Sequence, residues 1–233
     1  MKELLKLISL EIRKNKLKGM SKAIIIANLA VLAMMVFMLL IDRNEPSHAF
    51  TTLENMFDGL FMLLRAVYIV FAAVLISKLV IEEYKNNTVT VLFMYPISRK
   101  KLLAAKLICI FLFTLMNIIV SGLVLGAIMN GINHYTGILP GEMSWTLLWS
   151  ELVKLGTGSL YAAGIALIPL YFGMLKKSVP ATIISAVLLS SVISGDFNQY
   201  RLGDMVAVCI GLSLIGIAIS YLSIRNVETE DIA

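Results

Sequence analysis

Long apolar runs alternate with short polar stretches along the chain, and this pattern predicts membrane-spanning helices. A helix needs about 20 mostly apolar residues to cross a bilayer. Helices are favoured over a barrel because each run is continuously apolar, without the alternation of a β-strand. Six runs meet or approach this length: Ala23–Ile41, Gly59–Ile81, Leu107–Met129, Leu155–Leu175, the shorter Val179–Ser194, and Met205–Ile224.

The first 20 residues have the pattern of an amphipathic helix. Leu4, Leu5, Ile8 and Ile12 recur at helical spacing, and the basic residues lie mostly off that stripe. A helix of this kind lies in the plane of the membrane interface. The alternative, a solvated charged tail, leaves the repeating apolar face unexplained. We therefore expect an interfacial helix over residues 1–20.

The composition supports a membrane protein rather than a soluble one. Of the 233 residues, 59% are hydrophobic and only 15% are charged, whereas soluble domains carry about 25% charged residues. The two cysteines, Cys109 and Cys209, lie in apolar runs without a C-x-x-C spacing, so neither a disulfide framework nor a zinc site is indicated. The expected fold class is an all-α membrane protein with one transmembrane domain over residues 1–233.

Lys and Arg residues gather at alternate connections, which sets the expected orientation. The first 22 residues carry seven Lys or Arg residues, whereas residues 42–58 have one, against four acids. The connection between the second and third spans is again basic, through Lys85, Arg99, Lys100, Lys101 and Lys106. We therefore expect both termini and this second connection to be cytoplasmic.

The second connection also has an apolar stripe. Val89, Leu92, Phe93 and Ile97 could form one face of a short helix, which Pro96 would end or bend. A cytoplasmic helix with one apolar edge is suited to docking into a groove on a partner protein.

The residues of this connection carry a resemblance. An acid near the end of the second span, an Asn-Thr turn, an apolar pair, P-I-S-R and a lysine in the next helix resemble the permease subunits of ABC type-2 transporters. In that family the segment, here residues 84–100, is the coupling helix that contacts the ATPase subunit. Asn87 stands where the family often has Gly, a mild departure because Asn tolerates left-handed geometry. The matching positions are Glu83, Asn87, Thr88, Leu92, Pro96, Ile97, Ser98, Arg99 and Lys106.

The small size and simple loops look most like the bacitracin-resistance, lantibiotic-immunity and phenol-soluble-modulin exporter permeases. The resemblance implies the membrane subunit of a bacterial exporter in the cell membrane. Its substrate would be an antimicrobial or secreted peptide, or a lipid-linked compound. The chain has no G-x-x-x-x-G-K-[ST] motif, so ATP and Mg²⁺ would be bound by a separate ATPase subunit. No enzymatic site, metal, cofactor or nucleic-acid partner is expected in this chain.

Two features are candidates for further roles. Arg65, in the second span, could snorkel to the outer headgroups and pair with Asp58, or it could contact an acidic group of a substrate or lipid. Ala181 and Ser185 form a small-xxx-small pair in the fifth span. The resemblance implies that the first and fifth spans form a dimer interface, either between two copies or with a sister permease.

Two other classes of protein compete with the exporter. Glu82–Glu83 is similar to the paired acids of CAAX-type membrane proteases, but His48 and His134 fall in connections expected to be external. Acids and histidines would then be separated by about 30 Å of membrane. A membrane scaffold or sensor without transport is the second alternative.

Overall fold

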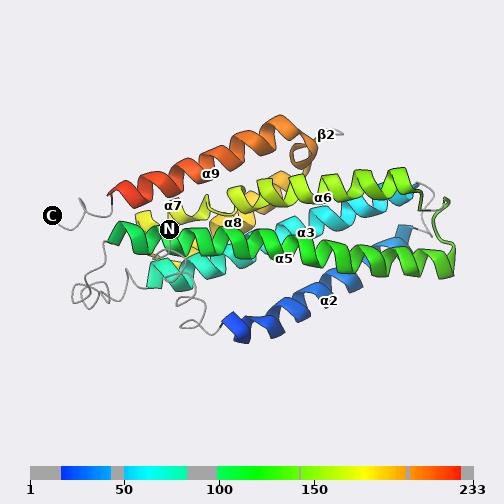
Figure 1. Ribbon diagram of the computed structural model, residues 1–233, viewed down its shortest axis with the longest axis horizontal. Coiled ribbons are helices and arrows are strands. Elements are labelled where there is room, and N and C mark those ends of the chain that lie inside the picture. The colour runs from blue at the N-terminus through cyan, green and yellow to red at the C-terminus, as the bar shows by residue number, and fades with distance from the viewer. Residues whose placement is uncertain (1–16, 43–49, 83–98, 142, 198–199, 227–233) are drawn as a thin grey trace.

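The computed structural model describes residues 17–42, 50–82, 99–141, 143–197 and 200–226. They form an elongated bundle of helices that run roughly along one axis (Figure 1). Five described helical stretches are long and apolar enough to cross a membrane, and α8 is a shorter apolar helix. The elements in chain order are α2 (Leu17–Asp42), α3 (Leu53–Ile76), the π-helix η1 (Ser77–Ile81), α5 (Arg99–Thr136), α6 (Trp145–Ile165), α7 (Pro169–Lys176), α8 (Val179–Ser194), the two-residue strands β1 (Asp196–Phe197) and β2 (Tyr200–Arg201), the short 3₁₀ helix η3 (Leu202–Asp204), and α9 (Val206–Asn226).

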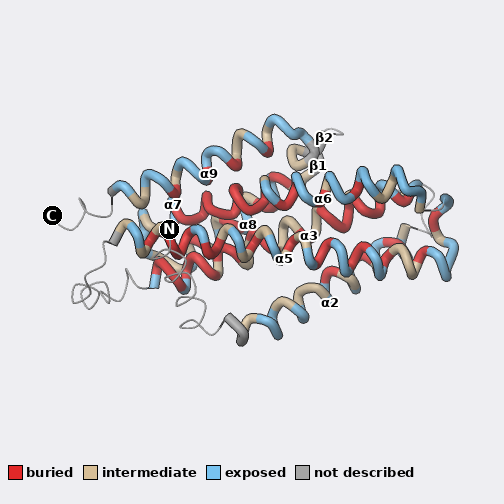
Figure 2. The backbone as a smooth tube through the Cα atoms, in the orientation of Figure 1, coloured by how far each residue is buried: buried red, intermediate tan, exposed pale blue. Residues whose placement is uncertain are grey.

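Helix α3 lies at the centre of the bundle. It packs against α5, α6 and α8, and it holds many of the largest fully buried side chains, including Tyr68, Leu60 and Leu64. Thr52 caps its start by accepting a hydrogen bond from the Asn55 backbone N–H. By contrast, α2 and α9 lie at opposite edges with largely exposed apolar side chains (Figure 2).

The core has two parts along the bundle axis. One cluster joins the first half of α3 to α2, α5 and α6. The other joins the second half of α3 and η1 to α5, α7 and α8. In the first part, the Tyr68 hydroxyl contacts Ser121 Oγ at 2.6 Å and donates to Asn28 Oδ1 at 3.2 Å. This polar contact links α2 and α5 to the central helix.

The all-helical membrane fold expected from the sequence is confirmed. The fifth predicted span, Val179–Ser194, coincides with α8. Helix α5 runs well past the predicted third span at both ends, over 38 residues, or about 57 Å at 1.5 Å per residue. The interfacial helix expected over residues 1–20 lies outside the described residues, apart from 17–20, which belong to α2.

The fourth predicted span, Leu155–Leu175, differs most from the structure. Its helix begins ten residues earlier, at Trp145, and is interrupted between α6 and α7. The backbone N–H groups of Leu167 and Ile168 donate to carbonyls three residues back, at 3.1 and 3.0 Å. Pro169 follows directly and has no N–H to continue the α-helical ladder.

Small residues in the spans pack within the chain. A side chain at Gly122 or Gly126 would meet Leu155 of α6 or Phe57 of α3. Ala181 and Ser185, the candidates for a dimer interface, are half-buried on α8. They border an exposed apolar face of that helix, formed by Ile184, Val187, Leu188 and Val192.

Candidate functional site

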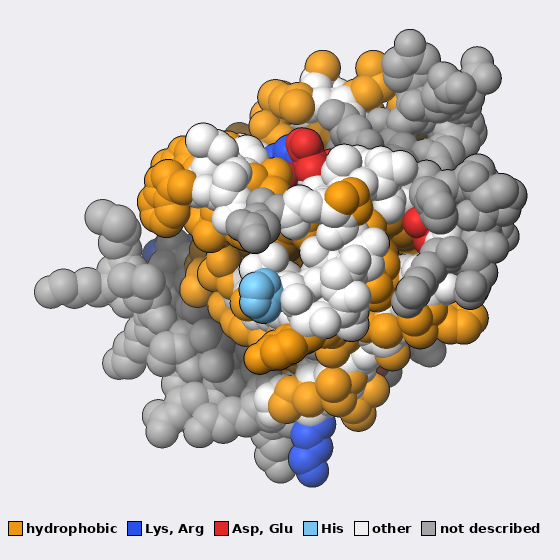
Figure 3. Space-filling model, turned by 90° about the vertical axis from the view of Figure 1, so that its right-hand side faces the viewer, with side chains coloured by type: hydrophobic (Ala, Val, Ile, Leu, Met, Phe, Trp, Pro, Cys, Tyr) orange, Lys and Arg blue, Asp and Glu red, His pale blue; other side chains and the backbone are white. Residues whose placement is uncertain are grey.

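A cluster of charges joins α3 to α6 at the bundle end that is expected to be external. The Lys154 ammonium group of α6 donates to Glu54 Oε1 at 2.7 Å and to Asp58 Oδ1 at 3.2 Å, both on α3. It also lies 3.1 Å from Glu151 Oε1, one turn earlier on α6. Figure 3 views this end and shows acidic and basic side chains next to each other, among hydrophobic and other side chains.

Glu151 is the buried member of this cluster, with only 4% of its surface exposed. Neither of its carboxylate oxygens has a hydrogen-bond partner among the described residues, although the ion pair with Lys154 is close. Its charge is therefore balanced mainly by this one lysine. Burying a charge costs free energy unless an opposite charge lies close to it. The ion pair with Lys154 therefore offsets the cost of burying the Glu151 carboxylate.

Arg65 does not pair with Asp58, which was one of the two roles considered for it from the sequence. Asp58 contacts Lys154 instead, while the Arg65 guanidinium group lies against Gly158 of α6 and donates to the Gly203 carbonyl at 3.4 Å. Seven residues separate Arg65 from Asp58, about 10 Å along a helix, and Lys154 reaches Asp58 from the neighbouring helix. Gly158 makes room for the guanidinium group, because a Cβ atom at this position would collide with it.

Arg65 lines a hollow of about 260 Å³ between α3, α6 and the start of α9. Among its described lining residues are two cations, Arg65 and Lys154, and one acid, Asp58. Thr157, Gly158 and Tyr161 form the α6 side, and Gly203, Val206 and Cys209 close it from the other side. The hollow is the most polar of the described pockets.

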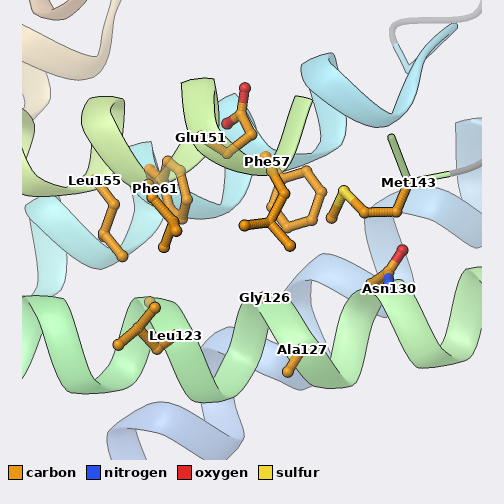
Figure 4. Close-up of a pocket in the computed structure, with 12 residues that line it drawn as sticks. Phe57, Phe61, Leu123, Gly126, Ala127, Asn130, Met143, Glu151 and Leu155 are labelled. Atoms are coloured by element: carbon orange, nitrogen blue, oxygen red, sulfur yellow. The ribbon is translucent and has the colours of Figure 1, made fainter. Parts of the chain in front are cut away.

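A second, mainly apolar pocket of about 380 Å³ lies between α3, α5 and α6. Phe57 and Phe61 of α3 project into it, and Gly126 and Ala127 of α5 face them (Figure 4). The Glu151 carboxyl group points away from α5 in this view. The pocket therefore offers apolar contacts, while the charges lie on its α6 side.

The opposite end of the bundle holds a buried lysine beside the π-helix. Lys106 of α5 is only 3% exposed, and its ammonium group donates to the Leu79 carbonyl of η1 at 2.8 Å. A π-helical turn interrupts the regular hydrogen bonding of an α-helix, and here Lys106 donates to a carbonyl of the π-helix η1. This contact ties the end of the second span to the start of the third, at the base of the predicted coupling segment.

Most of that predicted segment lies outside the described residues. This holds for Glu83, Asn87, Thr88, Leu92, Pro96 and Ser98. Arg99, placed at the end of the segment, is the first residue of α5, so the segment's last two residues belong to the third membrane helix. Glu82 directly follows η1, which contacts the first turns of α5, whereas His134 lies in the last turn of the 38-residue α5. No described residues gather as a possible metal site.

The chain belongs to the ABC-2 transporter family: the family described as ABC-2 family transporter protein matches residues 7–192. It is a transmembrane permease component of that family. A similar protein is the uncharacterized protein YcbO of Bacillus subtilis (strain 168), which is 37% identical over 225 residues, or 97% of this chain and 99% of that protein. No solved structure matches the chain.

The sequence indicates Arg65 as a candidate but not the cluster around Lys154. A partial signal for the cluster is its spacing: Glu54 and Asp58 are four residues apart and Glu151 and Lys154 are three apart, so each pair can lie on one face of a helix. The missing information was that these two faces meet, because the contact joins residues about 100 positions apart in the chain.

Proposed function

We propose that this chain is the membrane subunit of an ATP-driven bacterial exporter. A separate ATPase binds ATP and Mg²⁺, and the permease acts as a dimer of two copies or with a sister permease. The substrate is an amphipathic peptide or a lipid-like compound. Membership of the ABC-2 family is the observation that carries this proposal, because the family implies a membrane component that associates with an ABC ATPase.

The path of coupling runs from residues 84–100 into the core. When the ATPase subunits close on ATP, the segment moves the helices that flank it. Two observations support this route. Lys106 ties α5 to η1, and Leu79, Ile81, Leu103 and Leu107 share one apolar cluster there. Because α3 also packs against α6 and α8, a shift at its end would reach the whole bundle.

The termini and residues 84–98 face the cytoplasm in this proposal. The support is the charge at the two ends of the bundle. The described residues at the ends of η1, α7 and α9 and at the start of α5 include Lys78, Lys100, Lys101, Lys176, Lys177 and Arg225 with one acid, Glu82, while the opposite end has Asp42, Glu54, Asp58 and Glu151 with Lys154. Basic residues accumulate on the cytoplasmic side of membrane proteins.

Substrate and dimer contacts complete the proposal. Arg65 contacts the substrate in the outer half of the path. A charged residue inside a membrane helix is energetically costly, and such residues often mark substrate pathways. The dimer interface includes Ala181 and Ser185. Their half-burial beside an exposed apolar face leaves room for a second helix to pack there.

The decisive experiment is co-purification of the ATPase with a tagged Leu92→Asp variant. Burying one leucine is worth roughly 1.5–3 kcal/mol, and an unpaired charge in the interface costs more. We expect docking to weaken by at least about one to two powers of ten, while membrane insertion is unchanged. The control is Tyr135→Asp, at a side chain that is 91% exposed at the other end of α5, and it should retain the ATPase.

Full ATPase binding by Leu92→Asp would contradict the coupling assignment. An ATPase that binds the unaltered chain but drives no export of any amphipathic substrate would favour the scaffold or sensor instead.

A further inference from the structure

The hollow around Arg65 presents hydrogen-bond donors that the described residues leave mostly unused. The guanidinium group has five N–H donors, yet its described hydrogen bond is a single long one of 3.4 Å to Gly203 O. Tyr161 lines the same hollow, and its hydroxyl has no hydrogen-bond partner in the described part of the chain. The Thr157 hydroxyl already donates to backbone carbonyls of its own helix.

The described acids near the hollow are directed to another cation. Asp58 is the acid among its described lining residues, and its carboxylate contacts the Lys154 ammonium group at 3.2 Å. Glu54 and Glu151 meet the same lysine at 2.7 and 3.1 Å. Lys154 therefore serves three carboxylates, while Arg65 lies about two turns deeper along α3 with its positive charge facing the hollow.

We propose that this hollow binds the phosphate group of a lipid-like amphiphile, with Arg65 as the main contact and the Tyr161 hydroxyl as a second donor. The planar guanidinium group matches two phosphate oxygens at once, which makes arginine a preferred ligand for phosphate. The hollow, at about 260 Å³, has room for a phosphate group together with several waters, each of which occupies roughly 30 Å³. This inference rests on the proposed function and specifies its substrate class.

The surrounding charges favour a phosphate that is held by a lipid over one that is free in water. Glu54 and Asp58 are the most exposed members of the cluster at the bundle end, with side chains 52% and 41% exposed. They repel an anion that approaches from the aqueous side. A phosphate attached to an apolar tail can instead reach the hollow from the outer leaflet, past the α6 and α9 residues that line it.

The test measures binding of a fluorescent phosphatidic acid to the purified chain in nanodiscs of phosphatidylcholine. We expect saturable binding to the unaltered chain, a dissociation constant at least about tenfold higher for Arg65→Met, and an intermediate value for Arg65→Lys. Lys78→Met is the matched control, because it removes an exposed membrane-helix cation at the opposite end of the bundle, and its binding should match that of the unaltered chain.

A second variant guards against loss of folding in Arg65→Met. Gly158→Val keeps the arginine but places a side chain where its guanidinium group lies, and it should also weaken binding. Excess inorganic phosphate distinguishes the two sources of the ligand, and we expect little competition from it.

Three results would overturn the proposal. The first is no saturable binding by the unaltered chain. The second is that Arg65→Met and Gly158→Val both bind the lipid probe as tightly as the unaltered chain, and the third is complete competition by excess inorganic phosphate. The assay contains no ATPase, so such a failure leaves the exporter proposal standing, and loss of ATPase docking leaves the lipid site standing.

Discussion

Lys154 contacts three carboxylates, and the energetic value of each contact depends on how buried the acid is. Glu54 is half exposed, and a pair of that kind contributes about 0–1 kcal/mol. Glu151 is buried in the contact between α3 and α6 and has no described hydrogen-bond donor. The lysine therefore acts less as a stabilising surface bridge than as the compensation for one buried charge.

Replacing Lys154 with Met should destabilise the protein much more than replacing Glu54 with Gln. We expect a loss of about 3 kcal/mol for Lys154→Met, because Glu151 would keep its burial and lose its cation. Glu54→Gln should cost about 1 kcal/mol or less, since it removes only an exposed partner. The measurement is the unfolding midpoint of each purified variant in one mild detergent.

The double variant Lys154→Met with Glu151→Gln tests the cause. It should recover most of the lost stability, because the neutral amide no longer needs a cation, and the recovery is a coupling energy between the two residues. If the double variant is as unstable as Lys154→Met alone, the lysine stabilises the bundle by some other contact.

At the scale of the helices, hydrophobic runs located the spans well but not their interruptions. The fifth span matched α8, whereas the fourth divides into α6 and α7. The sequence signal for this break is Pro169, which lies inside the apolar run that predicts a single fourth span. The apolar pattern does not predict the early start of α6, because Glu151 and Lys154 interrupt the apolar run. In the structure these residues contact each other, and Lys154 also contacts α3.

Glycines set the distance between α6 and α9. A Cβ atom at Gly216 of α9 would collide with the carbonyl oxygen of Gly164 on α6, and one at Gly164 would collide with Ser213. The two backbones therefore approach closely just before the break at residues 166–168. Small residues at such positions allow van der Waals packing between helices in a membrane, where the lipid supplies no hydrophobic driving force.

Gly216→Ala should accordingly destabilise the α6–α9 contact. The obstacle is backbone rather than a flexible side chain, so we expect a loss of about 1–3 kcal/mol from overpacking, measured as a lower thermal midpoint in detergent. Gly211→Ala is the matched control on the same helix, because a Cβ atom there meets nothing within 4 Å. Its midpoint should stay the same or rise slightly, since alanine favours a helix over glycine. Equal midpoints for the two variants would show that the close approach does not limit the packing.

At the scale of the whole molecule, composition identifies a membrane protein but does not predict which helix lies at the centre of the bundle and which lies at its edge. Helix α2 is as apolar as α3, yet α3 is central and α2 lies at the edge. Lipid and protein interior are equally apolar, so hydropathy does not distinguish the helix faces that meet each of them. The site had the same limit: Arg65 was recognisable as a charge inside a span, but its partner Gly203 is 138 positions away.

The charge difference between the two ends of the bundle predicts how the molecule crosses the membrane. We expect a single cysteine at Tyr135 to react with a membrane-impermeant maleimide on intact cells, and one at Lys176 to react only after permeabilisation. Both side chains are exposed, at opposite ends of the bundle.

The background carries Cys109→Ala and Cys209→Ala, and both native cysteines are buried. Lys177 remains in the second variant to keep a basic residue at that end. If the cysteine at Lys176 is labelled from outside and the one at Tyr135 is protected, the orientation is the reverse of the one proposed. Residues 84–98 would then lie outside the cytoplasm, and a cytoplasmic ATPase could not dock on them.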